Sequence, residues 1–116
     1  MEASRTQISD AVRVAAERLS AATGSDSVIL FGSRARGDNG PESDWDLAVL
    51  LPEDITPQQF TPSKLWKMVA DLKEGIQVFP IRKSVFEANR HDPNSVSHGI
   101  ATDGVAVIGE VPATYS

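Results

Sequence analysis

Two aspartates, preceded at a fixed distance by a glycine–serine pair, are the residues of this sequence that could do chemistry together. Gly32 and Ser33 are followed, after ten residues, by Asp44 and Asp46. Side chains two apart in a strand share a face, so both carboxylates point one way while Trp45 points the other. Two ionised carboxylates that close repel each other, and a divalent cation that prefers oxygen ligands, Mg²⁺ or Mn²⁺, relieves the repulsion. The pair is therefore a candidate metal site.

The glycine–serine pair adds a place for a phosphate group. Gly32 lets a phosphate approach the backbone, and Ser33 offers a hydroxyl group where a helix would begin. Backbone N–H groups exposed at such a start favour phosphate binding. Each half alone is a weak signal, because glycine–serine turns and solvated Asp-x-Asp pairs are both common. Together, at the end of one expected strand and the start of another, they are far more specific.

This segment resembles the signature of the polymerase-β-type nucleotidyltransferase superfamily. The wider strings FGSRARG at residues 31–37 and SDWDLAVL at residues 43–50 look like its minimal nucleotidyltransferase (MNT) branch. The close match covers residues 28–51, and a looser match in element order extends over residues 12–108. The resemblance implies an α/β (α+β) fold with one small mixed sheet and helices packed mainly on one face.

The resemblance also implies a reaction and roles for the four residues. Gly32 and Ser33 would hold the β- and γ-phosphates of an incoming nucleoside triphosphate, ATP or another NTP. Asp44 and Asp46 would be the catalytic residues and would bind the Mg²⁺ or Mn²⁺ that bridges triphosphate and nucleophile. A nucleoside monophosphate would pass to an acceptor hydroxyl group, with release of pyrophosphate.

Two arginines near this segment are candidate phosphate ligands. Arg34 and Arg36 carry guanidinium groups, which bind phosphate through two parallel hydrogen bonds. The alternative is that one of them forms a structural ion pair with Asp38, Asp44 or Asp46. The sequence leaves both interpretations open.

One position departs from the family pattern. Active members usually carry a third carboxylate on a following strand, and the matching position in the strand expected at residues 76–81 is Gln77. Glutamine is neutral and cannot act as a general base, although its carbonyl oxygen can still accept a hydrogen bond. Glu74 lies three residues earlier, where strand alternation puts it on the opposite face unless the strand is bulged. The set of three carboxylates is thus incomplete, because Gln77 stands where the family usually has the third.

The remaining pattern predicts elements that alternate between helix and strand. Apolar residues at helical spacing predict a helix over residues 6–22 that ends at Gly24. Threonine–proline pairs at residues 56–57 and 61–62 predict helix starts, the second leading an apolar stripe that Gly75 stops. Ser84 and Glu87 match a capping box. Strands are expected at residues 27–31, 44–51, 76–81 and 105–108, and a further helix at residues 95–101.

Four other side chains could have a functional role but are interpreted as structural. Trp45 is expected to pack on the back of the sheet, and Trp66 in the core, with partner contact as the alternative. His91 and His98 have no acid at ligand spacing, so they are interpreted as surface or capping residues.

Composition excludes several function classes. The 116 residues contain no cysteine, which excludes disulfides and thiolate sites, and the net charge of −5 argues against bulk DNA or RNA binding. No apolar run approaches the ~20 residues that span a bilayer, and no signal-peptide pattern opens the chain. We therefore expect one domain over residues 1–116, located in the cytoplasm, with no membrane partner.

Three functions remain open. The first is an Mg²⁺-dependent transferase that moves AMP from ATP to a protein, because MNT domains of this kind are frequently antitoxins paired with a HEPN-type toxin. The second is a catalytically degenerate MNT domain in which Gln77 marks the lost ligand and the partner is neutralised by binding alone. Adenylylation of a small molecule, such as an antibiotic, fits less well because the chain has little room for an acceptor pocket.

Overall fold

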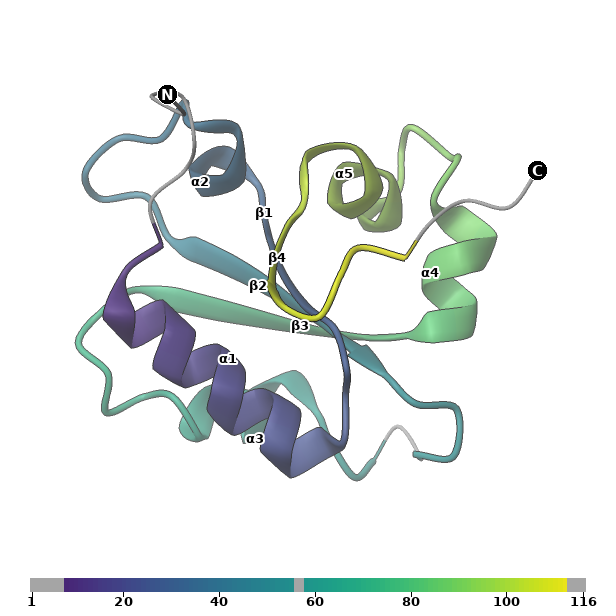
Figure 1. Cartoon of the computed structure of the whole chain (residues 1–116), viewed down its shortest axis with the longest axis horizontal. Helices are drawn as coiled ribbons and strands as arrows, with labels where there is room; N and C mark the ends of the chain where they lie inside the picture. Colours follow the sequence, from purple (N-terminus) through teal and green to yellow (C-terminus); the bar gives the residue numbers. More distant parts are fainter. Residues whose placement is uncertain (1–7, 56–57, 113–116) are drawn as a thin grey trace.

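A mixed sheet in the order β3-β2-β1-β4 organises the chain, and Figure 1 shows helices on both of its sides. The structure is a computed structural model that describes residues 8–55 and 58–112. β2 pairs antiparallel with β1 and parallel with β3, and β4 pairs antiparallel with β1. The strands are β1 Val28–Phe31, β2 Trp45–Leu51, β3 Ile76–Arg82 and β4 Val105–Ile108.

The helices divide between the two faces of the sheet. α1 (Asp10–Thr23) and α3 (Pro62–Lys67) pack on one face, and α4 (Lys83–Asn89) and α5 (Val96–Asp103) pack on the other. A short helix, α2 (Ser33–Arg36), follows β1. The predicted fold class, a small mixed α/β sheet, is confirmed. The helices cover both faces instead of mainly one, although the larger core lies on the α1 side.

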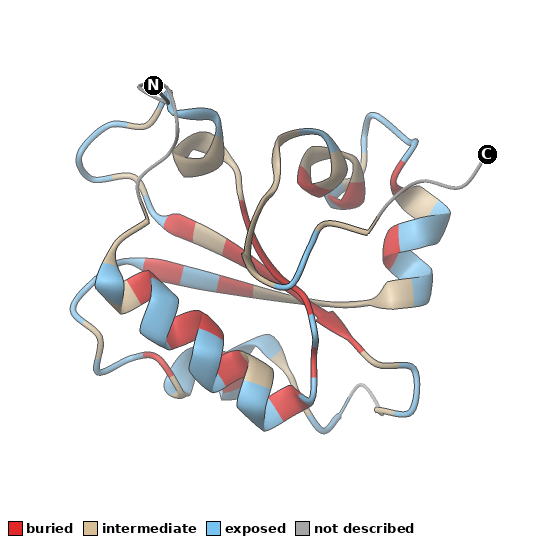
Figure 2. Ribbon diagram, viewed as in Figure 1, coloured by how far each residue is buried: buried red, intermediate tan, exposed pale blue. Residues whose placement is uncertain are grey.

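Strand alternation builds both cores from one continuous apolar strand. Leu47 and Val49 of β2 enter the cluster under α1, whereas Ala48 and Leu50 enter the smaller cluster with Phe86 of α4. Figure 2 shows the resulting buried stripe through the middle of the sheet. A strand that is buried on both faces has a nearly continuous apolar sequence. The strand predicted at residues 44–51 therefore agrees with β2 to within one residue.

Two predicted helix boundaries are confirmed, Gly24 at the end of α1 and Thr61 at the start of α3, while Ser9 and Ser95 supply caps that were not predicted. Ser9 accepts a hydrogen bond from the Val12 N–H, and Gly24 ends α1 with a φ of 77°. Thr61 caps α3 in the same way through the Lys64 N–H, and Ser95 caps α5. Residues 6 and 7 of the first predicted helix, and the threonine–proline pair at residues 56–57, lie outside the described residues.

The helix expected to run to Gly75 is shorter than predicted. α3 ends at Lys67, and the chain continues through bonds from Met68 N–H to the Leu65 carbonyl and from Leu72 N–H to the Val69 carbonyl. These bonds span three residues instead of four, so the backbone tightens into turns. The apolar stripe still packs on the core, but the turns carry part of it.

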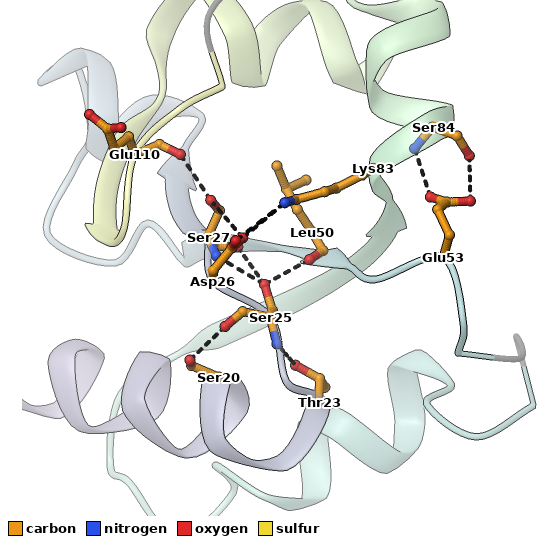
Figure 3. A network of polar contacts seen from close by, with 10 residues as sticks. All are labelled: Ser20, Thr23, Ser25, Asp26, Ser27, Leu50, Glu53, Lys83, Ser84 and Glu110. Atoms are coloured by element: carbon orange, nitrogen blue, oxygen red, sulfur yellow. Dashed lines mark hydrogen bonds and ion pairs between the residues drawn. The ribbon is translucent and has the colours of Figure 1, made fainter.

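The capping box predicted at Ser84 is wrong, because α4 begins one residue earlier and a distant acid supplies the cap. The carboxylate of Glu53 accepts hydrogen bonds from the backbone N–H and the hydroxyl group of Ser84, both at 2.9 Å (Figure 3). These two donors lower the pKa of Glu53. Glu53 thus ties the end of β2 to the start of α4.

Serine hydroxyl groups fix the turn between α1 and β1. The Ser25 hydroxyl lies 2.7 Å from the Leu50 carbonyl and 2.9 Å from the Ser27 carbonyl, and the Ser27 hydroxyl donates to the Glu110 carbonyl (Figure 3). Lys83 adds an ion pair with Asp26 at 3.1 Å.

The described residues include no helix long and apolar enough to cross a membrane.

Replacing Glu53 with alanine should lower the melting temperature at neutral pH, because Ser84 loses both acceptors. A carboxylate with a lowered folded-state pKa stabilises the protein above its unfolded pKa, and this contribution disappears as the pH falls through the folded pKa. The difference from wild type should therefore shrink in acid. Thermal denaturation across pH measures it, with Asp54→Ala as the neighbouring control; a pH-independent difference would contradict the assignment.

Candidate active site

The turn after β1 brings Gly32 against one of the two predicted carboxylates. Phe31, the last residue of β1, pairs with Asp46 across the antiparallel ladder. Gly32 then turns away with a φ of 78°, and a Cβ at this position would collide with the Asp46 carboxylate. Only glycine satisfies both demands, since side chains other than hydrogen are strained at positive φ. The absence of a side chain at Gly32 therefore leaves room for the Asp46 carboxylate. The sequence alone did not reveal this contact.

The start of β3 brings a second glycine and Gln77 against the other carboxylate. Gln77 pairs with Asp46 across the parallel ladder, and its side-chain N–H donates to Asp44 Oδ2 at 2.8 Å. A Cβ on Gly75 would come within 2.5 Å of Asp44 Oδ1. The register thus places Gln77 beside the acids, where the resemblance expects the third carboxylate. Gly75 was missed as a site residue, although a glycine directly before a strand signals such a close approach.

Asp46 is half-buried, and its electrostatic environment disfavours its ionised form. Burial raises its pKa most, the negative charge of Asp44 raises it further, and the positive charge of Arg36 lowers it in part. A cation between the two carboxylates would remove both penalties. The residues therefore fit a divalent metal ion.

The donor set also indicates how such an ion would be held. Among the described residues, no group of three or more histidines and acids is placed to bind a metal. Asp44 and Asp46 offer two carboxylates on one face, beside the amide of Gln77. Mg²⁺ is commonly held by one or two carboxylates together with substrate phosphates and water. The pair matches that arrangement better than a metal cage built from protein alone.

Arg34 braces the loop that leads to the acids. Its Nε and Nη2 donate to the Ser43 carbonyl at 3.1 and 2.9 Å, and Nη2 also donates to the Pro41 carbonyl. Its guanidinium lies over the Trp45 ring, 4.3 Å from the centroid. Since Trp45 and the carboxylates point to opposite faces, these contacts lend no support to the phosphate role predicted for Arg34, which stays a prediction.

Arg36 is the arginine whose charge reaches the acid pair. It forms ion pairs with Asp38 at 3.1 Å and Asp103 at 3.8 Å, and it lowers the pKa of Asp46 through its charge. The ion pair with Asp38 is one of the structural ion pairs that the sequence analysis gave as the alternative to phosphate binding. Because Arg36 remains half-exposed on the side of Asp46, a contact with phosphate stays a prediction.

The face behind the acids is closed by Trp45, as predicted. Trp45 is 6% exposed, and its indole N–H donates to Glu74 Oε1 at 3.0 Å. Glu74 is thus held by Trp45, although it also lines a small cavity together with Asp44 and Gln77. Its predicted place on the opposite face stays a prediction.

A comparison with known protein families shows to which family the chain belongs. The sequence profile of the nucleotidyltransferase domain family matches residues 12–92, which include both the glycine–serine pair and the two aspartates. The chain belongs to the nucleotidyltransferase domain family. The resemblance stated from the motif is confirmed.

Two solved structures share the fold of this nucleotidyltransferase domain. One is a candidate nucleotidyltransferase from Sulfolobus solfataricus, with a TM-score of 0.52 and 19% identity over 83% of this chain and 75% of that one. The other is a toxin–antitoxin structure with AMP-PNP, with a TM-score of 0.57 and 20% identity over 84% of this chain and 73% of that one. No curated protein matches the sequence.

Three side chains outside the site of this nucleotidyltransferase domain can also be compared with their predicted roles. Trp66, expected in the core, is 52% exposed, because α3 turns that side outward. His98 binds the Arg90 carbonyl through Nδ1 at 3.0 Å, in line with its structural interpretation, and His91 is exposed.

Replacing Gly32 with alanine should displace the Asp46 carboxylate and lower the affinity for Mg²⁺-ATP by about tenfold or more. Gly37→Ala controls for an alanine at positive φ, because Gly37 has a φ of 84° and no atom within 4 Å of the added Cβ. The backbone of Gly32 (φ 78°, ψ −159°) is more restrictive than that of Gly37 (φ 84°, ψ 8°), so the melting temperatures of both variants are compared with their affinities. Equal affinities for the two variants, measured by calorimetry, would refute the collision.

Replacing Asp46 with asparagine should raise the melting temperature of the metal-free protein at neutral pH. The raised folded-state pKa means that ionised Asp46 destabilises the fold, and asparagine removes this charge. The gain should shrink as the pH falls through the raised pKa, because wild-type Asp46 then takes up a proton. Thermal denaturation in EDTA tests this, and a lower melting temperature for the variant at neutral pH would contradict it.

Proposed function

We propose that this nucleotidyltransferase domain transfers AMP from ATP to a hydroxyl group of a partner protein, with Asp44 and Asp46 holding the Mg²⁺ (or Mn²⁺) that accompanies the triphosphate. The observation that carries the proposal is the pair of carboxylates on one face, one of them seated against Gly32 at the turn into α2. Gly32, Ser33 and Arg36 surround the place where phosphates would lie. Residues 1–116 act as one domain in this proposal.

In the proposed step, the acceptor oxygen forms a bond to the α-phosphorus as the bond to the bridging oxygen of pyrophosphate breaks. A bound metal ion supplies charge stabilisation for the phosphates. Asp44 and Asp46 would hold that ion beside the triphosphate, and Gln77 holds the Asp44 carboxylate in place. Gln77 accepts no proton, so the proton of the acceptor hydroxyl passes to water or to a base on the partner.

A protein acceptor is favoured over nucleic acid. The net charge of −5 repels a phosphate backbone. One neighbour of similar fold was solved as a toxin–antitoxin assembly with an ATP analogue. We infer that the present protein is the antitoxin of such a pair, that its partner is a HEPN-type toxin, and that both act in the cytoplasm, where ATP and Mg²⁺ are available.

A second function is favoured by one contact. Gln77 donates to Asp44 where active relatives would place a negative charge, so the acids are partly satisfied without a metal. In this alternative the domain is catalytically degenerate and silences its partner by binding alone. It retains the fold and needs neither nucleotide nor metal.

Calorimetric titration of ATP separates the two functions. With Mg²⁺, we expect binding that EDTA abolishes and that Asp44→Asn weakens by about tenfold or more, because one ligand charge is lost. Asp54→Asn, a change of the same kind outside the site, should bind like wild type. Absence of binding with and without Mg²⁺ would overturn the transferase proposal and leave the contact-only alternative.

Transfer itself is followed with ATP labelled at the α-phosphate. Asp46→Asn should abolish labelling of the partner, whereas Gln77→Asp should increase it, because the third carboxylate is restored beside Asp44. If Asp44→Asn still silences the partner as wild type does, silencing proceeds without transfer.

A further inference from the structure

An apolar groove runs along the outer edge of the sheet, directly beside the acids. It has a volume of about 690 Å³, and its floor is β3, which pairs only with β2 among the strands of the described residues. Trp66 of α3 forms one wall and Val96 at the start of α5 forms the other, with exposures of 52% and 51%. None of the described residues that line it is charged, although nearly a quarter of the sequence is charged. Such a surface suits an uncharged occupant.

The backbone of β3 presents hydrogen-bonding groups to this groove. The Trp45 N–H donates to the Gly75 carbonyl at 2.7 Å, so Gly75 faces β2. Backbone groups alternate along a parallel strand, so Gln77 and Phe79 also face β2, whereas Ile76, Val78 and Pro80 face the open edge. Pro80 has no N–H, which confines full pairing to Ile76 and Val78, the part of the strand nearest the acids. Only an extended polypeptide matches this pattern of donors and acceptors.

The groove and the acid site meet at Gln77. This residue lines the groove and donates to Asp44 Oδ2 at 2.8 Å. An added strand would lie about 4.8 Å from β3 on the side away from β2. Its side chain beside Gln77 would share the face of the carboxylates, with Gln77 between them. A hydroxyl-bearing residue at that point would be presented to the nucleotide.

We propose that the acceptor protein docks by adding an extended, largely apolar segment to the open edge of β3, with its hydroxyl-bearing residue beside Gln77. This inference rests on the proposed transfer to a protein. Self-pairing fits the edge less well: two antiparallel copies of β3 centred on Val78 would set Ile76 opposite Pro80, which lacks the N–H that this pairing needs. A second copy would also cover the groove that leads to the acids.

The test compares two valines of similar exposure at the starts of neighbouring helices. Val96 (51% exposed) lines the groove, and Val85 (47% exposed) lies on α4 outside it. The probe is a pool of short synthetic peptides with apolar residues at alternate positions and a central serine, threonine or tyrosine. Wild type and Val85→Glu should capture peptides at least about tenfold better than Val96→Glu, because the new charge would be buried by the peptide.

A second measurement follows the backbone directly. Amide hydrogen exchange at Ile76 and Val78 should slow when the captured peptides are added, whereas exchange at Phe79, already directed to β2, should not change. Trp66→Glu on the opposite wall should reproduce the loss seen for Val96→Glu. Melting temperatures show that each variant is folded.

Each remaining outcome separates docking from nucleotide chemistry. Absence of capture by wild type, or equal loss in Val85→Glu and Val96→Glu, would overturn the docking site. Loss of Mg²⁺-ATP binding in Val96→Glu would also overturn it, because the groove would then hold the nucleotide. Dimerisation of wild type that Val96→Glu abolishes would assign the edge to a second copy. If peptides are captured but ATP is not bound, the proposed transfer fails and the docking site stands.

Discussion

The repulsion between two carboxylates held on one face of the sheet is the interaction around which the rest of the site is arranged. Folding brings Asp46 partly out of water beside Asp44, which raises its pKa and costs free energy while both are ionised. The chain accommodates the carboxylates sterically with two glycines that leave room for them, Gly32 against Asp46 and Gly75 against Asp44. It offsets the charge only in part, through Arg36 on one side and the amide of Gln77 on the other.

The mixed sheet is the topology that brings these groups to one place. β1 is antiparallel to β2, so the end of β1, with Gly32 after it, lies beside the start of β2. β3 is parallel to β2, so its start, with Gly75 before it, reaches the same point from the other side. An all-parallel or all-antiparallel sheet of these strands would separate the two glycines. The acids at the start of the central strand are therefore flanked by both neighbours at once.

The sequence predicted the parts of this structure that depend on local pattern. The apolar run of β2 gave its bounds to within a residue, and strand alternation placed Trp45 behind the acids and Gln77 beside them. Features that depend on distant contacts escaped it. The carboxylate of Glu53 lies 31 residues from the Ser84 it caps, and no local pattern connects the two. Trp66 was expected in the core because it adjoins Leu65 in an apolar stretch, but α3 buries Leu65 and turns Trp66 outward.

The packing of Arg34 on Trp45 places a positive charge against an indole whose fluorescence can be measured. The guanidinium contacts the buried indole on one side and holds the Ser43 carbonyl, next to Asp44, on the other. Any movement of the loop before the acids must shift this cation over the ring. The fluorescence of an indole responds to a nearby charge. With the second, exposed tryptophan, Trp66, replaced by phenylalanine, the emission of Trp45 would report on the order of this loop without an added label.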